Sequence, residues 1–229
     1  PGIGYVTGKM IYVNPDGSVT GDGCSAYMRY ENRLRSLETA VGSVVGVDGG
    51  IDAVRKALYR PMRADQLPDF VLPLDVVAQG YRVVYEPGAY LRETALAEAS
   101  DEYRMRVRVS LRAFWALKDM RHLLSFRRNA LYAWQLWSHK VLRYLSFVFL
   151  VGAYIGNALL VQDASSYAFL FAMQTLGYVA SLTAPFISKK GLRFVLMIHY
   201  FVLINVAALH AFLKFTLGHK QVVWTPRKG

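Results

Sequence analysis

The sequence LPDFVLPLDVVAQGYRVVYEP, residues 67–87, predicts a helix that leads directly into a buried strand. Asp69 stands where an N-cap residue belongs, and Pro73 falls in the first turn, where its missing N–H costs least. Gly80 is suited to end the helix. The strand is predicted over Arg82–Tyr85, because β-branched and aromatic residues alternate there before a Glu-Pro-Gly triplet ends it.

Further elements are predicted on both sides of this unit. Tyr5 to Val13 has strand composition and ends at a turn. Tyr27 to Val44 carries apolar residues at helical spacing, and a glycine-rich turn then breaks the helix. A second helix is predicted over Ile51–Leu58, and a basic amphipathic helix over Glu102–Met120. Alternating helices and strands predict an α/β domain.

The chain divides into a polar part and an apolar part. Three stretches come close to the roughly 20 apolar residues that a helix needs to cross a bilayer. These stretches are residues 144–161, 167–187 and 194–215. We therefore predict an α/β domain over residues 1–122, an amphipathic helix at the membrane interface over 123–143, transmembrane helices within 144–217 and a tail over 218–229.

The basic residues predict the orientation in the membrane. Residues 104–143 and 188–193 are rich in Lys and Arg, so both are expected on the cytosolic side, with 162–166 outside. Two spans satisfy this arrangement, but a third would carry Lys220 outside. Either the tail departs from the charge rule, or the last apolar stretch bends back or lies partly at the surface. We expect an integral protein of a bacterial cytoplasmic membrane with its soluble part facing the cytosol.

Two histidines lie within the last apolar stretch. His199 and His210 are eleven residues apart, which is roughly 16 Å along a helix axis and too far for one metal ion. Together with Asn205 they predict hydrogen bonds between helices.

The formal net charge is +11 with a pI near 9.8, which fits anionic lipid or phosphate as a partner. Zinc-finger spacing and an RNA-binding aromatic signature are both absent from the sequence, so nucleic acid is not an expected partner. Cys24 is the single cysteine, which excludes an internal disulfide and fits a reducing compartment.

Several motifs occur in a fixed order along the chain. They are the helix with Glu31, Arg35 and Glu38, the turn Gly46-Val47-Asp48-Gly49-Gly50, the acid Asp69, the strand Tyr81-Arg82-Val83-Val84-Tyr85 and the tail Gln221–Arg227. This run resembles the acceptor-side part of membrane-embedded family 2 glycosyltransferases, the relatives of cellulose, chitin and hyaluronan synthases. The resemblance implies the C-terminal part of a GT-A-like domain followed by transmembrane helices.

The resemblance also implies inverting transfer of a sugar from a nucleotide-diphosphate donor to a saccharide or lipid-linked acceptor. Asp69 would be the general base. The residues that would bind substrate are Asp48, Gly49, Gly50, Arg104 and Arg108. Family members hold Mg²⁺ or Mn²⁺ through an Asp-x-Asp motif, which this sequence lacks. The cation and the donor-binding half are therefore expected upstream of Pro1, and this chain alone is expected to be inactive.

The sequence departs from the family pattern at two points. Pro68 stands where an acid is usual, and only Arg108 remains of the Gln-x-x-Arg-Trp motif, which favours transfer of one or a few sugars over a long polymer. Taken alone, Asp69 fits an N-cap. Arg104 and Arg112 fit anionic lipid as well as phosphate. The alternative function is a non-catalytic membrane interaction module derived from such an enzyme.

Overall fold

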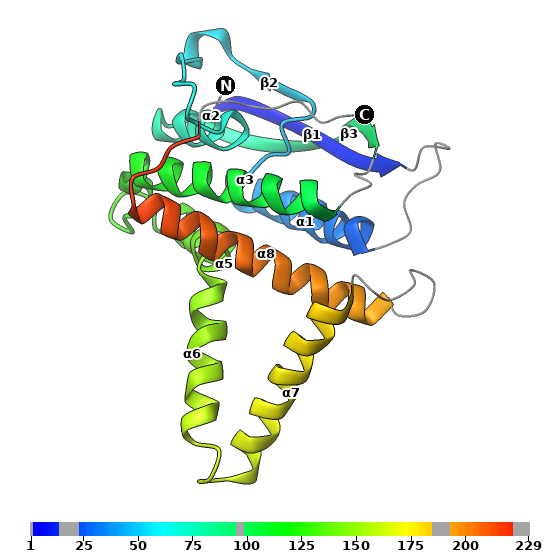
Figure 1. Cartoon of the computed structure of the whole chain (residues 1–229). Helices are drawn as coiled ribbons and strands as arrows, with labels where there is room; N and C mark the ends of the chain where they lie inside the picture. The colour runs from blue at the N-terminus through cyan, green and yellow to red at the C-terminus, as the bar shows by residue number, and fades with distance from the viewer. Residues whose placement is uncertain (1, 14–22, 95–98, 185–192, 222–229) are drawn as a thin grey trace.

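The computed structural model describes residues 2–13, 23–94, 99–184 and 193–221. A small sheet with helices on one face forms a headpiece from the described residues between 2 and 144, and a helical hairpin projects from the helical side, away from the sheet (Figure 1). The sheet contains β1 (Ile3–Val13), β2 (Asp52–Val54) and β3 (Arg82–Thr94) in the order β2-β1-β3. The protein is thus mostly helical with a small mixed sheet, which confirms the α/β prediction for the headpiece in this coarse form.

Strand β1 pairs with both other strands. It runs antiparallel to β2 and parallel to β3, from Ile3 opposite Arg82 to Val13 opposite Thr94. The prediction that β3 ends after Tyr85 is wrong, because residues 86–89 only interrupt the pairing, which resumes at Tyr90. Pro87 has no N–H for the ladder, so the strand bulges there and then continues.

The helix predicted over Ile51–Leu58 is also wrong. This segment forms β2 and a short 3-10 turn, η1 (Lys56–Leu58). The Ile51 carbonyl accepts a hydrogen bond from Gly8 N–H at 2.8 Å, and the Arg55 N–H donates to the Gly4 carbonyl at 2.9 Å. Pairing with the free edge of β1 therefore overrides the local helical pattern. The preceding helix was predicted correctly, as α1 (Gly23–Val41).

Helix α2 (Pro68–Ala78) lies at the centre of the headpiece. Phe70, Val71 and Leu74 pack against α3 (Ala99–Asp119) and α4 (Ala130–Leu136). Val76 packs on the other side against the sheet. A helix that is apolar on all sides is typically buried between two layers. Gly80 follows α2 with a φ of 86°, which confirms the predicted helix end.

The predicted interface helix over 123–143 is not one helix. The segment contains a 3-10 turn η2 (Arg121–Leu124), α4, a π-helical turn η3 (Trp137–Val141) and α5 (Leu142–Tyr144). Asn129 caps α4 by accepting a hydrogen bond from the Tyr132 N–H at 3.1 Å. Because α4 packs into the core beside α2, this segment belongs to the headpiece.

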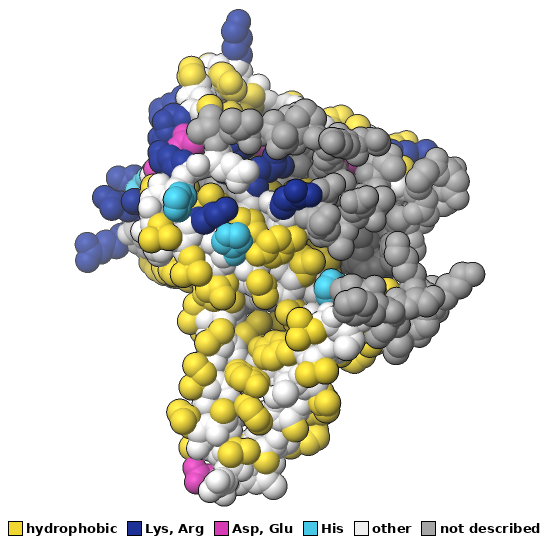
Figure 2. All heavy atoms as spheres, viewed as in Figure 1, with side chains coloured by type: hydrophobic (Ala, Val, Ile, Leu, Met, Phe, Trp, Pro, Cys, Tyr) yellow, Lys and Arg dark blue, Asp and Glu magenta, His cyan; other side chains and the backbone are white. Residues whose placement is uncertain are grey.

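Three apolar helices follow, α6 (Ser146–Leu159), α7 (Ser165–Thr183) and α8 (Arg193–Thr216). Among the described helices, α8 alone is long and apolar enough to cross a membrane by itself. The segment Ala130–Tyr144 and helix α6 are long and apolar enough only when they are counted as one span, and the two are bent by 58° relative to each other. The surface of the α6–α7 hairpin is mainly hydrophobic, whereas Lys and Arg gather on the headpiece (Figure 2).

The predicted polar contacts between the helices are confirmed. His199 Nδ1 lies 2.9 Å from the Ser181 carbonyl of α7, and His210 Nδ1 lies 3.0 Å from the Tyr103 hydroxyl of α3. The Ser146 hydroxyl donates to Asn205 Oδ1 at 2.6 Å. These bonds connect α8 with each of its neighbours.

Candidate functional site

Asp69 lies in the first turn of α2, and it is not the N-cap residue. Leu67 takes the N-cap position with extended backbone angles, because Pro68 occupies the first helical position, where its fixed φ fits. Pro73 lies in the second turn, inside the helix, so its predicted place in the first turn is wrong. The Asp69 carboxylate is therefore available for a role other than capping.

Gly49 lies directly against the Asp69 side chain. Its φ of 72° is left-handed, and a Cβ at this position would lie 2.8 Å from Asp69 Cγ. Such a contact is closer than any real side chain tolerates, so glycine is required here for its shape as well as its backbone angle. The glycine turn and the start of α2, 20 residues apart in the sequence, thus meet. We call Asp48, Gly49, Asp52 and Asp69 the acidic site.

The electrostatics of the acidic site favour a basic carboxylate at Asp69. Burial is the largest cause that raises the pKa of Asp69 above its ordinary value of 3.8, and the negative charges of Asp52 and Asp48 raise it further. A backbone hydrogen bond and the positive charge of Arg112 act in the opposite direction. The net result is a raised pKa, which is typical of a carboxylate that accepts protons.

Asp48 and Gly50 make contacts that stabilise the glycine turn. The buried guanidinium of Arg35 donates to both Asp48 carboxylate oxygens, and its Nε donates to the Gly46 carbonyl at 3.2 Å. Asp48 therefore fixes the glycine turn on α1, and direct substrate contact is not supported for it. A Cβ at Gly50 would lie 3.0 Å from Leu91 and Met10 side-chain atoms, so this glycine allows close packing on the sheet.

The arginines of α3 are only partly placed as expected. Arg104 is exposed and Arg108 is half-buried. Arg112, one turn further along the same helix face, carries a positive charge that acts to lower the pKa of Asp69. Its guanidinium donates to the Ala64 carbonyl at 3.1 Å and to the Gln221 carbonyl at 3.0 Å. The spacing of four along α3 is the signal that indicated Arg112.

Sequence reasoning missed a buried charged cluster beside the glycine turn. His139 lies between two carboxylates of α1, with Nε2 3.2 Å from Glu31 and Nδ1 2.9 Å from Glu38. Each ring nitrogen thus faces a carboxylate oxygen, from a different turn of α1. Arg143 pairs with the other Glu31 oxygen, and the Val45 N–H donates to Glu38 at 3.1 Å. We call His139, Glu31, Glu38 and Arg143 the His139 cluster.

The His139 cluster adjoins the acidic site. Burial opposes ionisation of Glu31, but hydrogen bonding from His139 and the charges of Lys140 and Arg143 outweigh it and lower the pKa of Glu31. Lys140 extends past Gly46 and lies 5.7 Å from the ring centre of Phe70, the neighbour of Asp69. Burial lowers the pKa of Lys140 to about 8. The only sequence signal was that Glu31 and Glu38 share one face of α1.

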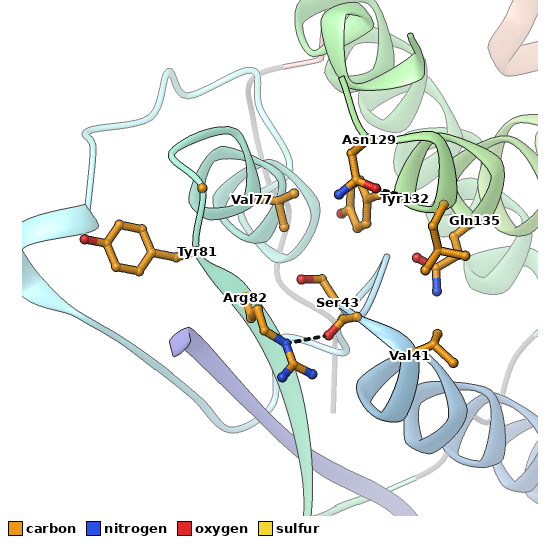
Figure 3. A pocket seen from close by; sticks show the side chains of 11 residues that line it. Val41, Ser43, Val77, Tyr81, Arg82, Asn129, Tyr132 and Gln135 are labelled. Atoms are coloured by element: carbon orange, nitrogen blue, oxygen red, sulfur yellow. Dashed lines mark hydrogen bonds between the residues drawn. The ribbon is translucent and has the colours of Figure 1, made fainter. Parts of the chain in front are cut away.

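Two pockets lie away from Asp69. One, of about 290 Å³, lies between the ends of α1 and α2 and the start of α4 (Figure 3). Its charged lining residue, Arg82, donates to the Gly42 carbonyl at 2.9 Å, and Tyr81 points away from the other labelled side chains. The other pocket, of about 520 Å³, lies between α1 and α4 beside the His139 cluster. Asp69 lines neither of them.

The donor set of the acidic site does not fit a divalent cation. Among the described residues, no group of three or more His, Cys, Asp or Glu side chains is arranged to hold a metal ion. Asp48 is bound by Arg35, and Asp52 is hydrogen-bonded by the hydroxyls of Tyr5 and Thr7.

Comparison with known proteins does not assign the chain to a family. No model of a protein family matches the sequence, and no curated protein matches it.

Proposed function

We propose that the protein is a membrane-bound inverting glycosyltransferase of the family 2 type, with Asp69 as its general base. The observation that carries this proposal is the half-buried Asp69 carboxylate, with its raised pKa, held against the left-handed Gly49. The donor is a nucleotide-diphosphate sugar, and the acceptor is a saccharide or a lipid-linked alcohol. The resemblance of the motif run to the GT-A-like acceptor half supports the same assignment.

The reaction assigns one chemical step to Asp69. A carboxylate oxygen takes the proton of the acceptor hydroxyl while that oxygen attacks the anomeric carbon of the donor sugar. A new C–O bond forms on one face as the bond to the nucleotide diphosphate breaks on the other, so the configuration inverts. Arg112 provides positive charge near the carboxylate, and Arg35 fixes the turn through Asp48. Mg²⁺ or Mn²⁺ is expected from the donor-binding part.

The experiment that tests the function is a transfer assay on the complete protein in membranes of a bacterial host. A panel of labelled nucleotide-diphosphate sugars is supplied, and lipid-extractable and polymeric products are separated. We expect label to enter a product with inverted anomeric configuration, in a manner that depends on one donor. No incorporation from any donor would contradict the enzyme.

Two observations favour a second candidate function. Asp69 lines neither pocket, and Asp48 is fully engaged by Arg35. Both facts fit a non-catalytic membrane interaction module derived from such an enzyme. The same transfer assay decides between the two, because the module predicts membrane attachment without incorporation of sugar.

Replacing Gly49 with alanine is expected to lower transfer about 100-fold. The new Cβ would lie 2.8 Å from Asp69 Cγ, so the carboxylate must move, and a displacement of about 1 Å in a reacting group costs a factor of this order. The left-handed backbone adds about 1–2 kcal/mol of strain. Initial rates and thermal unfolding of the purified variant measure the two effects separately.

Gly80→Ala is the matched control for this variant. Gly80 also has a left-handed φ, of 86°, but a Cβ there has no neighbour within 4 Å. The control should lose a similar amount of stability and keep its transfer rate within about threefold. Equal losses of activity in both variants would show that backbone strain alone is responsible and would remove the Gly49 contact from the mechanism.

The pH dependence of transfer follows from the raised pKa of Asp69. The base must be deprotonated, so kcat/KM should rise along an acid limb whose midpoint lies above 3.8. The effect on stability has the opposite sign. The folded protein holds this proton more tightly than the unfolded chain does, so the Asp69 contribution to stability falls as pH rises from 3.8 through the raised pKa. Initial rates between pH 4 and 8, with circular dichroism at each pH, provide the measurement.

A further inference from the structure

We propose that α6 and α7 form a two-helix membrane hairpin and that α8 lies in the headgroup region on the headpiece side. Of the alternatives that the sequence left open, this arrangement is the one in which the last apolar stretch lies at the surface, although the composition of α8 alone would allow it to cross. Contacts between the chain before the hairpin and the chain after α8 support it. It is independent of sugar transfer.

The chain returns to the headpiece after α8. Trp115 Nε1 donates to the His219 carbonyl at 2.9 Å, and Arg112 Nε donates to the Gln221 carbonyl at 3.0 Å. Lys220 Nζ lies 2.7 Å from Asp65 Oδ2 and 5.0 Å from the ring centre of Trp115. Tyr144 and His219 therefore lie on the same side of any membrane, and the chain between them crosses an even number of times.

The packing of α8 accounts for the missing third crossing. It runs along α3 and across the base of the headpiece, whereas α6 and α7 point away from it (Figure 1). Arg106 donates to the Tyr200 hydroxyl at 2.6 Å, and this hydroxyl donates to Glu102 at 3.2 Å. Ionised groups are costly in hydrocarbon, so α8 cannot cross without carrying these charges inward. It has instead the length and one-sided apolar exposure of a helix that lies in the interface.

The hairpin has the composition of a membrane insertion. Between Ser146 and Thr183 the sequence has one charged residue, Asp163, in the turn. Helix α6 has 14 residues and α7 has 19, so the two legs extend roughly 21 and 28 Å, and α7 comes close to the hydrocarbon thickness of about 30 Å. The polar contacts of the legs are satisfied between them, as where Gln174 donates to the Leu150 carbonyl at 2.9 Å. Exposed apolar side chains cover the outside, including Phe149, Ile155, Leu170 and Leu176.

The charge distribution supports the same placement. Exposed basic residues precede the hairpin, among them Arg121, Arg127 and Arg128, and Lys220 follows α8. Because Lys and Arg near membrane spans favour the cytosolic side, the headpiece and residue 220 are both cytosolic. The conflict between a third span and the basic tail therefore does not arise.

Single-cysteine labelling of the complete protein tests this topology. In a Cys24→Ser background, cysteine replaces Ala164 at the hairpin turn, His219 after α8, or Arg127 on the headpiece. An impermeant maleimide is applied to intact spheroplasts and to lysed ones. We expect the Ala164→Cys variant to be labelled in intact cells and the other two only after lysis. Labelling of the His219 variant from outside, or protection of the Ala164 variant until lysis, would overturn the proposal.

Depth measurements along α8 provide a second, independent test. Fluorophores at Phe194, Phe201 and Leu213, each replaced by cysteine, are quenched by lipids brominated at known depths. A helix in the interface places all three at the same depth within about 5 Å, whereas a spanning helix spreads them over roughly 28 Å. A gradient of that size would contradict the proposal even if the labelling result were as expected.

Discussion

Replacing Asp69 with asparagine is expected to lower sugar transfer by about 10²- to 10⁴-fold, because positioned general bases contribute rate factors of this size. Asparagine has nearly the same shape but accepts no proton at neutral pH. The carboxylate lies against Gly49 and near Asp48 and Asp52, so the amide fits the same space. The loss should appear mainly in kcat, with donor binding unchanged.

The stability of Asp69→Asn separates catalysis from a structural role. An acid in the first turn of a helix stabilises it by about 0.3–1 kcal/mol through the helix dipole. The raised pKa of Asp69 shows that ionisation is unfavourable in the folded state, so removing the charge offsets part of this loss. The net change in unfolding free energy should therefore be below about 1 kcal/mol, too small to explain a loss of activity.

Asp75→Asn is the matched control, since Asp75 is a partly buried carboxylate on the same helix. It lies 3.3 Å from Arg60 and 3.1 Å from Gln79, away from the acidic site. This variant should keep transfer within about threefold of the parent. Full activity in Asp69→Asn would remove Asp69 from the mechanism, and equal loss in both variants would indicate a general effect on α2.

The parts of the fold that could be predicted are those with strong local signals. Helix α2 was predicted from Asp69, Pro73 and Gly80, although the first two take other positions in it, and α3 was predicted from its amphipathic spacing. The segment 51–58 could not be predicted, because its conformation depends on hydrogen bonds to β1, far away in the sequence. The same holds for β3, whose continuation past Pro87 depends on pairing with the second half of β1.

In the candidate site, the sequence indicated Asp69 and Gly49 separately, as members of one ordered motif run, and their contact depends on how α2 packs on the glycine turn. The roles of its neighbours were not predictable. Arg35 satisfies Asp48, and this pairing depends on how α1 packs on the turn. The His139 cluster joins residues about 100 positions apart, and its histidine lies in a π-helical turn that no local pattern indicates. Tertiary packing therefore decides which of the charged residues remain available for chemistry.

Replacing His139 with alanine is expected to lower the free energy of unfolding by about 3–5 kcal/mol, because removing one partner of a buried ion pair leaves uncompensated charge. The His139 side chain is 6% exposed and lies between two carboxylates that are 3% and 4% exposed. Glu31 keeps Arg143 and Glu38 keeps the Val45 N–H, so the loss falls on one oxygen of each carboxylate. Denaturant unfolding in mild detergent measures the change.

His219→Ala is the control for His139→Ala, because its exposed side chain should change stability by less than about 0.5 kcal/mol. A triple variant, with glutamine at His139, Glu31 and Glu38, removes the buried charges together and should recover a large part of the lost stability. If the histidine acted only by filling space, the triple variant would be no more stable than His139→Gln alone. Recovery in the triple variant would show that the charges of α1 and η3 depend on one another.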